Sequence, residues 1–285
     1  MAEAAEDKED FSPSLDPPLD AQSAPATASS HTKKRNAFAE LMAPKSKLSK
    51  HDEVDPKPKS ALKKLVGWKG ALLEYIQHPE RFPSKVLRVT PNTVLIKDQY
   101  PKATVHLLLL PRSPAHYDLH PHEAFEDAEF LAIIREEAAS AAQIAAAELS
   151  RILSPFSASS KARNEAMDAG VPFDDLPAGR DYISEIRVGI HAHPSMAHLH
   201  IHIISPDMHS DSLKHRKHYN SFNTPFFIPV ADYPLDKTDE RRKTSFQNAN
   251  LSRDFVCWRC GKDFGNKFAK LKEHLEEEFQ EWRSE

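Results

Sequence analysis

The segment from His198 to Ile204 alternates histidines with apolar residues, and this pattern constrains the fold more than any other part of the chain. Successive side chains of a β-strand point to opposite faces. We therefore expect His198, His200 and His202 to line one face while the intervening apolar residues enter the core. The pattern predicts a strand over residues 197–205 that holds three imidazoles in a row.

Pro194 interrupts the chain just upstream of this strand, and a bend there could fold His191 and Ser195 over the same face. A neutral imidazole is nucleophilic near pH 7, and the phosphoramidate that it forms is labile enough to hydrolyse. A second histidine can fix the tautomer and a third can protonate the leaving oxygen. The cluster favours phosphoryl or nucleotidyl transfer. The residues alone leave two alternatives open, a metal site of alternate histidines and a set of structural histidines.

The remaining pattern predicts an α+β fold rather than alternating βαβ units. Apolar residues recur at helical spacing from Lys63 until Pro79, and an Ala- and Glu-rich run predicts one long helix from His122 to Leu153. The polar, Pro-containing stretch of residues 154–179 is an excursion between the long helix and the next strand. Strands are expected at residues 86–89, 94–97, 104–110, 182–190 and 197–205.

Residues 1–60 are rich in Ala, Ser, Pro, Asp and Lys, which predicts a disordered tail. Acidic residues dominate residues 1–30, whereas Lys and Arg dominate residues 31–72, so the tail contains a basic segment although the formal net charge of the chain is -4. Within it, residues 35–42 form either a partner-docking peptide or a chance apolar cluster. The two cysteines form one pair, and no membrane span or secretory signal is recognisable. We expect a soluble protein of a reducing, intracellular compartment.

The run from His198 to Ile204 resembles the His-φ-His-φ-His-φ-φ signature of the histidine-triad (HIT) superfamily, where φ is apolar. A closer similarity is to the aprataxin-like DNA-adenylate hydrolases of that superfamily. It is supported by residues 189–198 (GIHAHPSMAH), by residues 98–103 (DQYPKA), by His106 before an apolar strand, and by residues 214–222 ending in HYNSF. The resemblance covers the chain from about Lys63 to its end and implies a HIT domain with an antiparallel sheet.

The resemblance implies a role for each of four histidines. His200 would be the nucleophile that attacks the phosphorus of AMP, with His198 and His202 orienting it. His191 would assist the leaving phosphate. The excursion of residues 154–179 is longer than the family pattern, and His193 replaces a usually apolar residue, but neither change removes a catalytic group.

The resemblance also implies a set of substrate contacts. Ser195 and Lys102 would hold phosphate oxygens, placing positive charge where negative charge develops. Trp68 matches an aromatic residue that lies against the exposed base at a DNA end, although a core tryptophan of an amphipathic helix explains it nearly as well. The substrate-binding residues expected on this basis are Ser195, Lys102, Trp68, Asp98, Lys217 and His218.

The C-terminal segment has the spacing of a zinc finger. Cys257 and Cys260 are followed by thirteen residues and then His274, as in a C2H2 finger. No histidine or cysteine follows His274, so a fourth ligand must be a carboxylate. Glu278 lies one helical turn after His274, whereas Glu277 is the competing candidate. We expect a structural zinc ion, because so short a module has too little core to fold alone; the alternative is a free thiol pair.

Together these features predict a nuclear DNA-end repair hydrolase that removes AMP from adenylated 5′-phosphates at nicks and double-strand ends. The expected division is a tail (1–60), a HIT domain (61–222), a bridging segment (223–256) and a zinc finger (257–285). The tail would bind a repair protein. The competing hypotheses are a metabolic histidine-triad enzyme, acting on nucleoside phosphoramidates or dinucleoside polyphosphates, and a non-enzymatic nucleic-acid scaffold.

Overall fold

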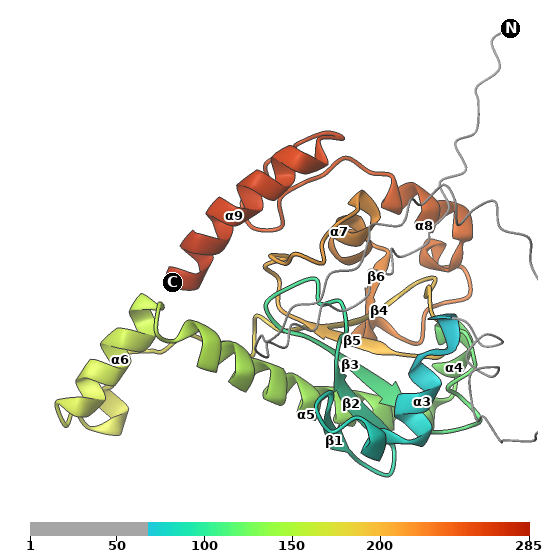
Figure 1. Cartoon of the computed structure of the whole chain (residues 1–285), viewed down its shortest axis with the longest axis horizontal. Helices are drawn as coiled ribbons and strands as arrows, with labels where there is room; N and C mark the ends of the chain where they lie inside the picture. Colours follow the sequence, from blue (N-terminus) through green and yellow to red (C-terminus); the bar gives the residue numbers. More distant parts are fainter. Residues whose placement is uncertain (1–67) are drawn as a thin grey trace, which may run out of the picture. The chain divides into compact units, whose positions relative to one another are not determined.

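The computed structural model describes residues 68–285, so the predicted tail, its basic segment and the run 35–42 lie outside the described residues. Within residues 68–285 the strands form one six-stranded antiparallel sheet in the order β1-β2-β3-β5-β4-β6 (Figure 1). The strands are β1 (Val86–Val89), β2 (Thr93–Lys97), β3 (His106–Pro111), β4 (Arg187–His191), β5 (Ile201–Ile204) and β6 (Phe227–Pro229). The α+β prediction with an antiparallel sheet is confirmed.

Helices surround this sheet. The α-helices are α3 (Leu72–Gln77), α4 (Pro121–Ala124), α5 (Ala128–Leu153), α6 (Ala158–Asp168), α7 (Arg216–Asn223), α8 (Thr244–Leu251) and α9 (Phe268–Ser284). Short 3-10 turns are η1 (Trp68–Gly70), η2 (Pro79–Arg81), η3 (Phe173–Asp175), η4 (Val230–Asp232) and η5 (Glu240–Arg242). None of the helices within residues 68–285 is both long and apolar enough to cross a lipid bilayer.

One face of the sheet packs against α5. Alternate residues of the central strands, including Leu107, Leu109 and Ile203, join Ile134 and the small Ala141 of α5 in the largest core cluster. Alanines on this side of α5 allow the helix to approach the strands closely. Leu199, Ile201 and Ile203 all belong to this cluster, which confirms that the apolar partners of the histidine run enter the core.

The opposite face of the sheet is divided between two clusters. Leu108 and Leu110 of β3 pack with Leu72 and Ile76 of α3. Farther along the same face, Ile204 joins a second cluster that extends through α7 into the C-terminal module; its members include Phe222, Phe227, Phe255, Leu271 and Leu275. The C-terminal module is therefore continuous with the core of the sheet.

Two sequence predictions on helices are wrong in their bounds. The run 122–153 is two helices: α4 ends at Ala124, and Asp127 caps α5, where its Oδ1 accepts hydrogen bonds from the backbone N–H groups of Glu129 and Phe130, both at 3.0 Å. The excursion 154–179 contains α6. The helix expected before Pro79 is only the short α3, preceded by η1, and residues 63–67 lie outside the described range.

Three strand predictions begin too early, and one strand is missing. The strand expected at 104–110 is β3, which begins at His106. The strand expected at 182–190 begins at Arg187, because residues 182–185 form a turn in which the Ile186 N–H donates to the carbonyl of Ile183 at 3.2 Å. The strand expected at 197–205 is only β5, since ladder pairing with β3 begins at Ile201. The edge strand β6, within the expected bridging segment, has too few residues to show a period of two.

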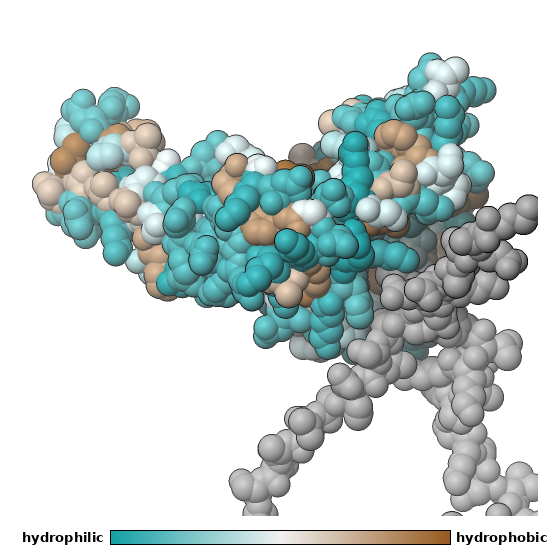
Figure 2. Space-filling view, turned by 90° about the horizontal axis from the view of Figure 1, so that it is seen from above, coloured by the Kyte–Doolittle hydropathy of each residue, from teal (hydrophilic) through white to brown (hydrophobic). Residues whose placement is uncertain are grey.

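The excursion exposes apolar side chains. Met167 at the end of α6 and Phe173 in η3 are 55% and 77% exposed. Brown residues gather on this lobe at the left of Figure 2, which otherwise shows a largely hydrophilic surface. The guanidinium of Arg163 lies 5.7 Å from the centre of the Phe173 ring and covers part of it.

Candidate active site

Strand register brings three histidines to one face of the sheet. His202 of β5 lies opposite Leu108 of β3 and Gly189 of β4. His106 and His191 lie two positions from these partners, so they project from the same face as His202. The rings of His191 and His202 are 4.4 Å apart, and those of His106 and His202 are 5.2 Å apart. Residues distant in sequence thus form one cluster.

Gly189 makes room for the aromatic wall of this cluster. A Cβ atom at this position would lie 2.5 Å from the ring of Phe227, a distance at which atoms overlap. The ring of Phe222 packs edge-on against His202 and His106, with centroids 5.1 and 5.3 Å away. The histidines therefore sit against apolar rings rather than water.

Hydrogen bonds fix the tautomers of His106 and His202. The backbone N–H of Lys102 donates to His106 Nδ1 at 3.1 Å, so His106 carries its proton on Nε2. That Nε2–H donates to His202 Nδ1 at 3.0 Å and lies 3.6 Å from a carboxylate oxygen of Asp98. Neutral His202 must then carry its proton on Nε2. This nitrogen is buried without a hydrogen-bond partner among residues 68–285, so it is available to a ligand.

The same reasoning fixes the tautomer of His200. His200 Nδ1–H donates to the backbone carbonyl of His198 at 2.8 Å, which leaves the His200 Nε2 lone pair free. His198 Nε2 lies 3.2 Å from a carboxylate oxygen of Asp118. The rings of His200 and His202 are 5.0 Å apart. The cluster therefore includes a free lone pair on His200 and a free N–H on His202, and His198 Nδ1 and His191 Nε2 are also buried without a partner among the described residues.

Burial keeps these imidazoles neutral. Removal from water lowers the pKa of His106 to about 4 and lowers the pKa of His200. The pKa values of His191 and His202 lie well below the usual range, first because of burial and then because neighbouring histidines repel a second positive charge. Neutral imidazole is the nucleophilic form.

Positive charge adjoins the neutral histidines. Burial lowers the pKa of Lys102, Asp98 opposes this effect, and the positive charge of Lys214 adds to it. Burial, followed by the charge of Lys102, lowers the pKa of His218 to about 4. The Lys102 ammonium donates to the carbonyl of Tyr100 at 2.6 Å. This basic rim, defined by Lys102 and Lys214, suits an anionic substrate.

The other predicted site residues are more dispersed. Ser195 is exposed on the connection between β4 and β5, and Lys217 is half-buried on α7. Trp68 begins η1, but its side chain lies outside what the structure describes, so both interpretations of it remain open. His193, to which we assigned no catalytic role, is half-buried with its ring 5.7 Å from that of His120.

The sequence pattern assigned no function to His106, Phe222 or Asp118, although all three contact the histidine cluster. His106 offered a signal, since it begins a buried strand at a polar position. The contacts of Phe222 and Asp118 depend on how α7 and the loop of residues 113–120 pack. Nothing in the sequence near His198 indicates them.

The C-terminal module brings together four potential metal ligands. One donor atom each from Cys257, Cys260, His274 and Glu278 lies within 4.8 Å of the others. Cys260 Sγ is 3.1 Å and Glu278 Oε1 is 3.0 Å from His274 Nε2. Two sulfurs, one imidazole and one carboxylate match the donors of a tetrahedral zinc site.

The surroundings distinguish the two candidate glutamates. The second oxygen of Glu278 accepts a hydrogen bond from Arg259 at 2.5 Å, which orients the first oxygen toward the cysteines. Glu277 lies beside the other nitrogen of His274, at 3.8 Å, and its side chain is 80% exposed. The buried Glu278 is the better ligand.

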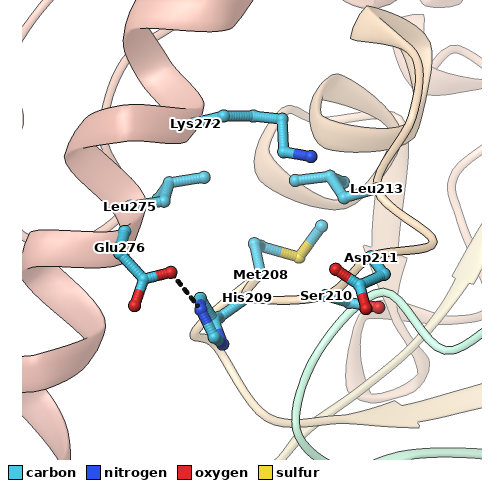
Figure 3. A pocket seen from close by; sticks show the side chains of 8 residues that line it. All are labelled: Met208, His209, Ser210, Asp211, Leu213, Lys272, Leu275 and Glu276. Atoms are coloured by element: carbon cyan, nitrogen blue, oxygen red, sulfur yellow. Dashed lines mark hydrogen bonds and ion pairs between the residues drawn. The ribbon is translucent and has the colours of Figure 1, made fainter.

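Helix α9 is attached to the catalytic unit at two places. A small pocket of about 120 Å³ lies between α9 and residues 208–213. Figure 3 shows His209 facing Glu276 at its edge, where His209 Nε2 lies 2.7 Å from the carboxylate of Glu276. At the other end, the indole N–H of Trp282 donates to Glu185 at 2.7 Å. Glu185 in turn forms a two-pronged ion pair with the buried Arg180. The finger and the histidine site are parts of one packed body.

Two protein families match this chain, one over the histidine cluster and one over the C-terminal module. Residues 80–209 match the HIT domain, and residues 223–281 match the C2HE / C2H2 / C2HC zinc-binding finger. This finger family and the cysteine, histidine and glutamate cluster indicate zinc binding. An aprataxin-like protein of Saccharomyces cerevisiae is 36% identical over 75% of this chain and 97% of its own length. One of Schizosaccharomyces pombe is 33% identical over 88% of this chain and 95% of its own length.

Comparison with solved structures leads to the same family. The aprataxin ortholog Hnt3 from Schizosaccharomyces pombe superimposes with a TM-score of 0.59 at 32% identity, covering 74% of this chain and 92% of that one. Aprataxin ortholog Hnt3 in complex with DNA superimposes with a TM-score of 0.61 at 31% identity, covering 76% of this chain and 96% of that one. The chain therefore belongs to the aprataxin-like proteins of the HIT superfamily.

Proposed function

We propose that this protein is a DNA-adenylate hydrolase that removes AMP from adenylated 5′-phosphate ends, the products of abortive ligation. The observation that carries the proposal is the free Nε2 lone pair of His200, fixed by the His198 carbonyl within a buried cluster of neutral histidines. Membership of the aprataxin-like proteins supports the hydrolase activity, and the Hnt3 structures containing DNA support the class of substrate.

In the proposed reaction, His200 Nε2 attacks the phosphorus of AMP, and the bond to the bridging oxygen of the DNA 5′-phosphate breaks. The 5′-phosphate leaves as an anion, and its oxygen is assisted by a hydrogen bond from His191, whose Nε2 is buried without a partner among the described residues. Water then cleaves the N–P bond and releases AMP. His198 and His202 orient the nucleophile, and the His202 N–H stabilises developing negative charge.

The proposed substrate contacts follow the basic rim. Lys102 and Ser195 hold phosphate oxygens of AMP, and Asp98, whose Oδ1 accepts the N–H of Tyr100, borders the nucleotide. Lys217 and His218 on α7 contact the DNA backbone. Trp68 stacks on the terminal base.

We propose that the zinc has a structural role, held by Cys257, Cys260, His274 and Glu278 in a closed shell that supplies no catalytic chemistry. Phe255 and Leu271 pack beside this cluster, which supports a role in folding the finger. We also propose that the chain divides into a HIT domain (61–222), a bridging segment (223–256) and a zinc finger (257–285). We further propose that the protein is nuclear and that its tail binds a repair protein.

The test compares AMP release from a 5′-adenylated nicked duplex with hydrolysis of a dinucleoside polyphosphate. We expect a higher kcat/KM on DNA, and loss of both activities in His200→Ala, with His200→Asn as the substitute if alanine is unstable. His78→Ala changes an exposed histidine paired with Glu80 and serves as the control. Preference for the dinucleotide would identify a metabolic enzyme, and normal turnover by His200→Ala would refute the mechanism.

A further inference from the structure

The proposed nucleophile lies outside the sheet. Ladder pairing of β5 begins at Ile201, which pairs with Leu109, so His200 and the residues before it receive no support from the strand hydrogen bonds. A nucleophile must nevertheless be held to within a fraction of an ångström, since a misplacement of about 1 Å costs orders of magnitude in rate. Another part of the chain must position this segment.

The loop of residues 113–120 contacts the segment at two adjacent positions. The carbonyl of Tyr117 accepts a hydrogen bond from the Leu199 N–H at 2.7 Å. The carboxylate of Asp118 lies 3.2 Å from His198 Nε2. The ring of Tyr117 also lies 5.7 Å from that of His198. One contact holds the backbone and the other holds the imidazole.

This loop is itself anchored. Its first turn closes through hydrogen bonds from the N–H groups of His116 and Tyr117 to the carbonyl of Ser113. The ring of His116 stacks on Phe130 at 3.9 Å and 4°, between the Ser113 hydroxyl at 2.8 Å and the Asp127 carboxylate at 3.1 Å. The loop is thus fixed to the first turn of α5, and α5 packs on the sheet.

We propose that Asp118 is a positioning residue for His200, acting through His198. Its carboxylate oxygen lies 3.2 Å from His198 Nε2, within reach of an Nε2–H, and would hold that imidazole in place. The carbonyl of the same residue then remains where it accepts His200 Nδ1–H at 2.8 Å, and His200 Nε2 keeps its lone pair toward the phosphorus. The proposal rests on the proposed function, because it assigns His200 as the nucleophile.

Asp118 acts as a hydrogen-bond acceptor rather than as a counter-charge. Its side chain is 66% exposed, so solvent screens its charge, whereas the His198 side chain is only 7% exposed. An uncharged acceptor of the same shape should therefore replace it. Because the carboxylate does not touch the reacting atoms, its loss should lower the rate of adenylate transfer without weakening substrate binding.

The experiment compares Asp118→Ala and Asp118→Asn by single-turnover formation of the adenylated His200 intermediate on a 5′-adenylated nick. We expect Asp118→Ala to lower the rate roughly 10- to 100-fold, the effect of losing one buried hydrogen bond, with the KM within about 2-fold of the original. Asp118→Asn should remain within about 3-fold of the original rate. Glu80→Gln removes an equally exposed carboxylate that pairs with His78, remote from the cluster, and should change nothing.

Three outcomes would overturn the proposal: an unchanged rate in Asp118→Ala, an effect confined to the KM, or an equal loss in Asp118→Asn. A second measurement does not depend on activity. In protein labelled with ¹⁵N-histidine, NMR should show His200 protonated on Nδ1, and Asp118→Ala should shift this signal toward a mixture of tautomers. An unaltered tautomer would also overturn the proposal. Absence of DNA deadenylation in the original protein would instead refute the proposed function, and the NMR result would still decide the role of Asp118.

Discussion

At the scale of single residues, the site depends on histidines that are kept neutral. Aromatic rings, above all Phe222, displace water from His106, His191 and His202. Burial then lowers the pKa of each of the three histidines. The folded protein thus favours the unprotonated imidazoles that nucleotidyl transfer needs, and this preference has a consequence for stability.

We predict that the free energy of unfolding falls as the pH falls from about 6.5 toward about 4. A histidine whose folded pKa lies below its unfolded value of about 6.5 binds its proton more readily in the unfolded chain. Its contribution is therefore complete above about pH 6.5 and is lost as the pH falls to the folded value, about 4 for His106. For His106 this corresponds to at most about 3 kcal/mol.

Urea unfolding at pH 7.5, 6.0 and 5.0 measures this effect. His106→Phe should flatten the dependence, because it removes one of the titrating groups, whereas His78→Gln, at an exposed position, should leave it unchanged. A stability that is independent of pH between 7.5 and 5.0 would show that the pKa values of these histidines are the same in the folded and unfolded states, which would contradict the prediction.

We also predict that replacing His106 lowers the catalytic rate. Replacing it by Phe removes the donor to His202 Nδ1, so His202 can carry its proton on either nitrogen and no longer presents Nε2–H reliably. We expect kcat to fall about 5- to 100-fold, the range for a lost buried hydrogen bond, with a smaller change in the KM. His106→Gln retains an N–H donor and should recover part of the rate. Wild-type kcat in folded His106→Phe would contradict the assignment.

Sequence alone predicted the residues that share one segment and missed the contacts between segments. The alternation from His198 to His202 indicated which side chains enter the core and which line the site, because successive side chains of an extended chain point to opposite faces. The hydrogen bond from His106 to His202 spans 96 positions and depends on the register of β3 against β5. Neither the register nor the path of the loop that holds Asp118 has a signal near the histidines.

At the scale of elements, the same limit explains the errors in helix and strand bounds. Periodicity located α5 and β5, but their ends depend on hydrogen bonds that it does not report. The carboxylate of Asp127 starts α5, and pairing on both sides of Ile203 limits β5. The C-terminal helix α9 was anticipated from the finger pattern. Its attachment through Trp282 and Glu185 was not.

The attachment of α9 to the main core determines how much of the finger should unfold when zinc is removed. We expect one zinc ion per chain, and we expect Cys260→Ser or chelation to unfold the segment of residues 256–267, because the metal would tie its two cysteines to α9. The C-terminal half of α9 should stay in place, because the buried Trp282 belongs to the main core. Elemental analysis measures the zinc, and limited proteolysis locates the unfolded segment.

The chelated protein should still hydrolyse a small adenylate, since the histidine cluster contains none of the four zinc ligands. Its affinity for a DNA end should fall. Ser252→Ala, an exposed change outside the metal cluster, provides the control. Freshly purified protein without zinc, or loss of hydrolysis of the small adenylate on chelation, would contradict the structural role.

At the scale of the whole molecule, the attraction of a phosphate group depends on the charges near the site rather than on the net charge of the chain. The formal net charge of -4 would repel nucleic acid, yet the positively charged Lys102 and Lys214 lie close together beside the histidine cluster. The basic run of residues 31–72 adds further Lys and Arg, most of them outside the described residues. Fields near a surface are set by the nearest charges within about 10 Å at 0.1 M salt, so the basic rim can bind phosphates despite the net charge.

We predict that binding to a DNA end weakens steeply with salt, because each Lys–phosphate contact releases condensed counterions. Lys214→Ala and Lys217→Ala should each reduce the slope of log K against log salt by roughly 1. Trp68→Ala should instead lower end affinity with little change in slope, because stacking on a terminal base releases no counterion. Fluorescence anisotropy of a labelled adenylated nick at several salt concentrations gives both quantities. If Trp68→Ala lowers the Tm sharply and leaves the affinity of the folded fraction intact, Trp68 is a core residue and the stacking assignment is wrong.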